Sequence, residues 1–151
     1  NPVKTYGVSG TYTVTLTVTD NSGASATRSG AVTVNAPGTQ TYTNNTDYPI
    51  NDNATINSPI RVTGRPRNAP INTPVAVNIV HTYIGDLRVS LIAPDGSAYV
   101  LHNYTGNSAD NINQTYIVNL SSERLNGTWR LRVTDSSNAD TGRIDSWSIT
   151  F

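Results

Sequence analysis

Residues 129–151 have the sequence WRLRVTDSSNADTGRIDSWSITF, in which two alternating segments flank an acidic loop. Apolar and polar residues alternate in residues 129–135 and again in residues 146–151, which is the period of a β-strand with one buried and one solvated face. The loop between them collects Asp135, Asp140 and Asp145, and its only basic residue is Arg143. The stretch therefore predicts two strands joined by a loop whose three carboxylates need an explanation.

The same alternation occurs along most of the chain. In residues 11–19, Tyr12, Val14, Leu16 and Val18 alternate with threonines. No stretch repeats with a helical period, and Gly, Pro, Asn and Asp cluster between the runs, as turns require. The sequence therefore predicts an all-β fold. Further strands are expected at residues 31–35, 60–64, 75–81, 87–94 and 98–102.

Composition excludes several classes of protein and site. Ten basic and ten acidic residues cancel, so no overall field attracts nucleic acid or an anionic membrane. No run approaches the roughly 18 apolar residues of a membrane helix, so no membrane partner is expected. Cysteine is absent, which excludes disulfides and thiolate metal sites. Methionine is absent even at position 1, which suggests an excised or processed piece with any signal peptide upstream.

A boundary is expected near residues 35–41, where NAPGTQT interrupts the strands. We therefore expect one unit at residues 1–36, a linker at 37–41 and a larger domain at 42–151. The first unit holds only two strands, and an isolated pair has too little apolar face to offset its ordering entropy. It is expected to be the remnant of a larger sandwich or to pack on a neighbour.

Residues 1–36 contain Tyr6, then Gly10-Thr11-Tyr12, and then Leu16, Val18 and Asp20 on one alternating run. In this pattern the segment resembles the C-terminal half of a polycystic kidney disease (PKD) domain. That family is an immunoglobulin-like β-sandwich found in secreted bacterial hydrolases. The resemblance therefore implies a partial immunoglobulin-like β-hairpin at the start of this chain.

Four stretches of residues 42–151 form a recognisable set of motifs: INDN at 50–53 with SPI at 58–60, HTYIGDL at 81–87 with LIAPDG at 91–96, GTW at 127–129 with Leu131, Val133 and Asp135, and DTG at 140–142 with Ser146-Trp147. In these motifs and their order, the segment resembles the P domain (P/Homo B), which follows the catalytic domain in proprotein convertases and ends many secreted bacterial proteases. The resemblance implies a jelly-roll β-sandwich without catalytic residues, in a secreted, extracellular protein. Its partner would be the catalytic domain of a serine protease or metalloprotease on the same parent chain.

Asp86, Asp135 and Asp140 all lie near strand ends and are the leading candidates for metal ligands. Carboxylates gathered without a counter-ion repel one another, whereas Ca²⁺ takes about six to eight oxygen ligands of the kind that loops supply. The chain offers few ligands for zinc, because it has no Cys and its only histidines are His81 and His102. Together with the resemblance to bacterial P domains that bind calcium, this pattern predicts a structural calcium site.

Asp52 and Asp110 are second-rank candidates, for this or another calcium site. The spacing of these aspartates is not that of an EF-hand, and Asp is an ordinary turn residue. Solvated turn carboxylates therefore remain an alternative for all five. Asp145 is expected to accept a hydrogen bond or to pair with Arg143.

No catalytic motif occurs in the chain: there is no Gly-x-Ser-x-Gly, no His-Glu-x-x-His and no glycine-rich phosphate loop. His81 is expected to make a structural hydrogen bond to a loop. Trp129 and Trp147 are expected to pack in the core. Arg61, Arg65 and Arg67 form a small basic stretch, interpreted as a solvated sheet edge guarded against pairing, with binding as the alternative.

Two functions follow as expectations. In the first, the chain is a non-catalytic accessory region that stabilises or helps to fold the catalytic domain of a secreted protease, with structural calcium. In the second, it is an autonomous targeting module that binds an insoluble protein, such as collagen, or a polysaccharide.

Overall fold

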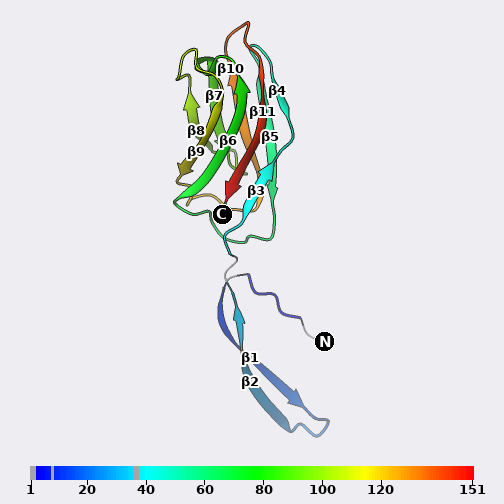
Figure 1. Ribbon diagram of the computed structural model, residues 1–151. Coiled ribbons are helices and arrows are strands. Elements are labelled where there is room, and N and C mark those ends of the chain that lie inside the picture. Colours follow the sequence, from blue (N-terminus) through cyan, green and yellow to red (C-terminus); the bar gives the residue numbers. More distant parts are fainter. Residues whose placement is uncertain (1–2, 8, 36–37) are drawn as a thin grey trace. The chain divides into compact units, whose positions relative to one another are not determined.

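The computed structural model describes residues 3–7, 9–35 and 38–151. It divides into two compact units, Asn1–Gly38 and Thr39–Phe151. Within the described residues the protein is all-β, with eleven strands and one short 3-10 turn, η1 (Ile84–Asp86), as the sequence predicted (Figure 1). No helix in that part of the chain is long and apolar enough to cross a membrane.

The first unit is an antiparallel hairpin of β1 (Gly10–Thr19) and β2 (Ser25–Val34), in which Thr11 pairs with Thr33 and Thr19 with Ser25. Its turn is held by Asp20, whose Oδ1 accepts hydrogen bonds from the backbone N–H groups of Ser22 and Ala24 at 2.9 Å each. Residues 1, 2, 8 and 36 of the predicted unit, and residue 37 of the predicted linker, lie outside the described residues.

The second unit is a sandwich of two antiparallel sheets (Figure 1). One sheet has four strands in the order β5-β10-β7-β8, and the other has the order β3-β11-β6-β9 with the short β4 also paired to β11. Strand β3 begins at the last residue of the predicted linker. The bounds are β3 Thr41–Asn44, β4 Tyr48–Ile50, β5 Thr55–Val62, β6 Thr73–His81, β7 Leu87–Ile92, β8 Ala98–Asn103, β9 Ile112–Val118, β10 Gly127–Asp135 and β11 Gly142–Thr150.

The core lies between the two sheets and is built from the inward positions of the alternating strands. Trp129 from β10 and Trp147 from β11 are both buried, which confirms their predicted packing. Each indole N–H still has an acceptor, the Leu125 carbonyl for Trp129 and the Ser58 hydroxyl for Trp147, both at 2.9 Å. The alternation therefore sets which face of each strand is buried.

Strands β3, β4 and β9 were not expected from the sequence. The first two are only four and three residues long. Among the strands that the structure describes, none pairs with the outer side of β9. Its INQTYIV sequence mixes exposed Asn113, Gln114 and Ile117 with half-buried Tyr116. An edge strand need not alternate strictly, because less of it is buried. The position of β9 follows from its pairing with β6.

Candidate functional site

Four loops at one end of the sandwich carry all five predicted metal ligands, and we call this region the loop end (the upper end of the second unit in Figure 1). Backbone hydrogen bonds join these loops. The Ser136 N–H donates to the Asp86 carbonyl at 3.1 Å, and the Ile84 N–H donates to the Ala109 carbonyl at 3.0 Å. The predicted residues lie between β4 and β5 (Asp52), in η1 (Asp86), between β8 and β9 (Asp110), and at the end of β10 and in the loop that follows it (Asp135 and Asp140).

A buried pair of His81 and Asp135 connects the two sheets at the loop end. The Nε2 atom of His81 lies 3.1 Å from Oδ2 of Asp135, and the two side chains are 0% and 1% exposed. On the other side of the ring, Nδ1 faces the backbone of Tyr83, 3.1 Å from its carbonyl oxygen and 3.2 Å from its nitrogen. The contact with Tyr83 confirms the predicted loop hydrogen bond of His81. The contact with Asp135 was not foreseen, because the two residues are 54 positions apart.

Asp135 uses both of its carboxylate oxygens within the protein. Oδ2 faces His81, and Oδ1 accepts a hydrogen bond from the Ser137 N–H at 2.9 Å. The backbone around the pair is also bonded: the Asp135 N–H donates to the Ala54 carbonyl, and the Asn111 side chain accepts from the His81 N–H at 3.0 Å. The pair is therefore the centre of a network that joins all four loops.

The other predicted ligands have more open environments. Asp140 accepts a hydrogen bond from the Thr82 hydroxyl at 2.6 Å, and the Oδ2 atom of Asp52 accepts one from the Ala139 N–H at 2.9 Å. The second oxygen of Asp52, Oδ1, is buried and has no hydrogen-bond partner. No side-chain hydrogen bond or ion pair involves Asp86 or the exposed Asp110 within the described part of the chain.

These carboxylates share one end of the fold but do not gather at one point. Among residues 3–7, 9–35 and 38–151, no three His, Cys, Asp or Glu side chains lie close enough together to hold a metal ion. A cation bound here would take at most two of these carboxylates. Its remaining ligands would be backbone carbonyls, amide oxygens and water, all of which calcium accepts.

Gly142 allows the first residues of β11 to lie against His81. A Cβ atom at this position would lie 2.1 Å from the Val80 carbonyl oxygen and 2.7 Å from Cδ2 of His81. Any side chain would therefore push β11 away from β6. This close approach is a physical reason for glycine in the DTG stretch.

Two expectations about charged side chains have different outcomes. Asp145 accepts hydrogen bonds from Arg143, with Nη2 at 3.1 Å, as predicted. The predicted solvated stretch at 61–67 is wrong for Arg65, which is 4% exposed. Its Nη2 donates to the Phe151 carbonyl at 3.1 Å, so that this arginine packs inside the fold while Arg61 faces solvent.

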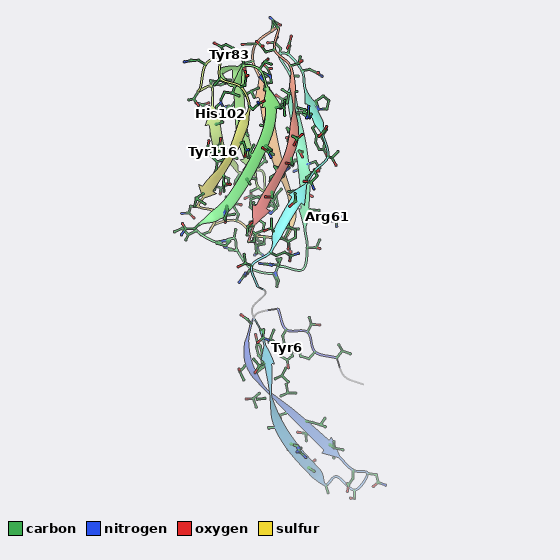
Figure 2. All side chains as sticks on the ribbon, in the orientation of Figure 1. Tyr6, Arg61, Tyr83, His102 and Tyr116 are labelled. Carbon is green, nitrogen blue, oxygen red and sulfur yellow. The ribbon has the colours of Figure 1, made fainter. Side chains whose placement is uncertain are left out.

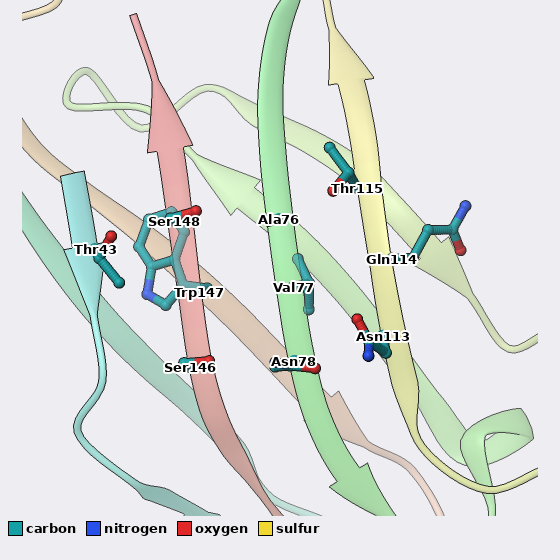
Figure 3. A pocket seen from close by; sticks show the side chains of 10 residues that line it. All are labelled: Thr43, Ala76, Val77, Asn78, Asn113, Gln114, Thr115, Ser146, Trp147 and Ser148. Carbon is teal, nitrogen blue, oxygen red and sulfur yellow. The ribbon is translucent and has the colours of Figure 1, made fainter. Parts of the chain in front are cut away.

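A shallow cavity of about 220 Å³ lies on the outer face of the five-stranded sheet (Figure 3). Its lining comes from four strands, β3, β6, β9 and β11, and includes Asn78, Asn113, Gln114 and Ser146. None of the lining residues is charged or is a histidine. The cavity therefore offers hydrogen bonds but no general acid or base.

Comparisons with known proteins agree with this architecture. Residues 72–151 match the family model of the proprotein convertase P-domain, and residues 1–36 match that of the PKD domain. The chain is 55% identical over 124 residues to leupeptin-inactivating enzyme 1 of Streptomyces exfoliatus, a match that covers 81% of this chain and 28% of that protein.

Two further relatives carry protease names. Over 144 residues, the chain is 43% identical to the transglutaminase-activating metalloprotease of Streptomyces mobaraensis, covering 93% of this chain and 19% of that protein. Over 113 residues, it is 39% identical to a calcium-dependent protease of Nostoc sp., covering 68% and 17%. The chain thus spans between 17% and 28% of the length of these three relatives.

A solved structure shows the same fold. The serine protease of Aeromonas sobria, in complex with a chaperone, aligns with a TM-score of 0.60 at 15% identity, covering 90% of this chain and 36% of that one. With the family model matching more than half of its length, the chain belongs to the proprotein convertase P-domain family and carries a PKD-domain segment before it.

Proposed function

We propose that this chain is a non-catalytic accessory region of a secreted protease, which stabilises the catalytic domain of the same parent chain and contains structural calcium. The relatives with protease names support the first part, since this chain corresponds to a minor part of each. A catalytic domain elsewhere in the parent chain is the partner that this coverage implies.

The observation that carries the non-catalytic role is the burial of His81 and Asp135. A His–Asp pair is two thirds of a serine hydrolase triad, in which the histidine must face a nucleophile and the substrate. Here the imidazole is fully buried, and its second nitrogen faces the backbone of Tyr83 rather than a serine. The geometry therefore favours a structural pair that holds the loop end together.

Calcium is proposed at the loop end, and the fit is best around Asp52. Its buried Oδ1 atom lacks a hydrogen bond, and an unpaired buried carboxylate oxygen costs free energy unless a cation or water compensates it. Asp86 and Asp140 are the further candidates, together with carbonyls of the same loops. Asp135 is less available, because its two oxygens face His81 and Ser137. The name of the Nostoc relative, a calcium-dependent protease, is consistent with this proposal.

The accessory role can be tested by expressing the parent protease with and without residues 39–151. We expect the shortened protein to give less folded enzyme and to lose activity faster on heating. Measurements of soluble yield and of residual activity after a heat step compare the two. Equal yield and equal half-life would contradict the accessory role.

Calcium can be tested separately on the 151-residue chain. A ligand that binds only the folded state stabilises it by about 2.7 kcal/mol at a hundredfold excess over Kd. We therefore expect a chelator to lower the melting temperature by several degrees, and calcium but not magnesium to restore it. The Asp52→Asn variant should lose this response, while Asp145→Asn, whose carboxylate pairs with Arg143, should keep it. Identical melting curves with chelator and with calcium would exclude a structural calcium ion.

A further inference from the structure

Four arginines occupy one face of the sandwich, the outer face of the β5-β10-β7-β8 sheet. The strand register shows this directly, because residues opposite each other in an antiparallel pair point to the same side. Arg132 is opposite Ser90 and Asn57, and Arg130 is opposite Ile92 and Pro59. The neighbouring positions Trp129, Leu131 and Val133 are buried, so these arginines face outward. By the same register, Thr134 is opposite Arg88 and Thr128 is opposite Arg61.

The four side chains form a continuous diagonal, Arg61–Arg130–Arg132–Arg88, which we call the arginine diagonal. Arg130 and Arg132 are two positions apart on one strand, and each of the outer two is a diagonal neighbour on the adjacent strand. Neighbouring arginines in this arrangement are about 7 Å apart, so the diagonal is on the order of 20 Å long. Figure 2 labels Arg61 at one end of it.

No carboxylate neutralises the arginine diagonal. The four strands of the sheet hold one acidic residue, Asp135, and it points inward to His81. In the described part of the chain, no ion pair involves Arg61, Arg88, Arg130 or Arg132. The nearest polar partners on the diagonal are neutral, such as Asn57, whose Oδ1 lies 3.2 Å from Nε of Arg132. Like charges near one another on one face repel, and a bound anion would relieve this repulsion.

A groove of about 350 Å³ runs along the same face, between Arg88 and Arg132. Ser90 and Ile92 form its buried floor, and Thr55, Asn57 and Thr134 add hydroxyl and amide groups. Guanidinium groups bind sulfate and carboxylate by paired hydrogen bonds. The groove therefore combines two anion-binding groups with neutral hydrogen-bonding groups of the kind that bind sugar hydroxyls.

We propose that the arginine diagonal binds a linear anionic polysaccharide that carries sulfate or carboxylate groups. A linear chain fits a linear run of positive charge. A folded acidic protein fits it less well, because stable protein interfaces need aromatic or apolar anchors and the most exposed large apolar residue on this face is Val100. Single-stranded nucleic acid would need aromatic rings for stacking, and the outward positions of these strands hold none.

The opposite face of the sandwich differs in charge. The outer face of the five-stranded sheet carries Arg143, whose guanidinium pairs with Asp47 and Asp145. The cavity on this outer face is lined by neutral residues. Binding of a polyanion should therefore be confined to one face of the domain. The inference is independent of the calcium site and of the accessory role.

The test is affinity chromatography and equilibrium binding of the 151-residue chain to immobilised dextran sulfate and polygalacturonate, with neutral dextran as the blank. We expect binding to at least one of the two anionic polymers, weakening steeply as salt rises because counterions are released. The Arg88→Gln/Arg132→Gln variant should bind about tenfold more weakly, with a shallower salt dependence. A matched control, Arg28→Gln/Arg124→Gln, makes the same change in net charge at positions outside the four strands of this sheet and should bind like the parent chain.

Several outcomes would overturn the proposal. They are unchanged binding by the Arg88/Arg132 variant, an equal loss in the control variant, equal retention on neutral dextran, or binding to duplex DNA or poly-glutamate without binding to either polysaccharide. Melting curves establish that each variant is folded. If the Arg88/Arg132 variant does not fold, Arg61→Gln/Arg130→Gln tests the other half of the diagonal with the same expectation.

Discussion

The β1–β2 hairpin and strand β10 have the same sequence pattern and different environments. In β1, Val14, Leu16 and Val18 alternate with threonines and are 40%, 58% and 58% exposed. In β10, Trp129, Leu131 and Val133 alternate with polar residues and are fully buried. The difference is the second sheet, which covers β10 and has no counterpart over β1 among the described residues of the first unit.

Alternation therefore predicts a strand and the face that it offers for burial, but not whether that face is covered. Burial of a large apolar side chain contributes about 1.5–3 kcal/mol, so the two regions should contribute very unequally to stability. The hairpin lies in the segment, residues 1–36, that matches the PKD-domain model. The predictions below compare the two regions.

The largest effect is expected from truncating equivalent positions in the two strands. Trp129→Ala removes a buried indole and its hydrogen bond to Leu125, and should lower the free energy of unfolding by about 3–5 kcal/mol. Leu16→Ala, at an exposed position, should change it by less than about 0.5 kcal/mol. Urea unfolding followed by circular dichroism measures both. Comparable losses would mean that the hairpin face is covered in solution.

A smaller effect is expected from breaking the His81–Asp135 pair, a contact for which the hairpin has no counterpart. Asp135→Ala leaves the imidazole buried without its partner and should cost about 3 kcal/mol. Asp20→Ala, in the exposed hairpin turn, should lower the stability much less. Both are measured by thermal and urea unfolding in chelator, so that any bound calcium is removed. An Asp135 variant as stable as the Asp20 variant would show that the pair does not hold the loop end together.

The smallest effect concerns two turn aspartates, one in each unit. Hydrogen bonds from Ser22 and Ala24 lower the pKa of Asp20, and those from Ser97 lower the pKa of Asp95. Because the folded pKa is depressed, each aspartate stabilises its turn above the ordinary carboxyl pKa of 3.8, and this stabilisation is lost as pH falls through the folded value.

The two carboxyls can be titrated by NMR in the same sample, where both should have a pKa below 3.8. Asp95 lies in the turn between β7 and β8 and reports on the sandwich, whereas Asp20 reports on the hairpin. An ordinary pKa for Asp20 beside a lowered one for Asp95 would show that the hairpin does not form stably in this chain. The comparison between the two regions would then become one between an unfolded and a folded segment.

Much of the fold could be predicted because it depends on local chemistry. Alternation located the strands that bury large residues. Local turn chemistry is likewise visible at Pro94-Asp95-Gly96, where Asp95 accepts a hydrogen bond from the Ser97 N–H. Strand β9 could not be predicted, because its exposed polar residues mask the period and pairing with β6 decides its place. Arg65 could not be predicted to be buried, because its acceptor, the carbonyl of Phe151, is 86 residues away.

The candidate site was only partly predictable. The acidic loop residues were found, and the structure brings them to one end of the sandwich. The hydrogen-bonding state of each carboxylate could not be predicted from the sequence, because it depends on long-range contacts. These contacts pair Asp135 with His81 and leave the buried Oδ1 of Asp52 without a hydrogen-bond partner. The arginine diagonal was also missed, because its four residues come from three strands and only one of them lies in the basic stretch at 61–67.

The sequence alone determined that this protein is all-β, which face of each alternating strand is apolar, and which families its two segments resemble. These properties follow from short-range alternation, turn chemistry and local motifs. Only the tertiary structure decided which charges meet, because strand pairing and sheet packing bring together residues tens of positions apart. It paired His81 with Asp135, left one oxygen of Asp52 buried without a partner, and aligned four arginines on a face with no carboxylate.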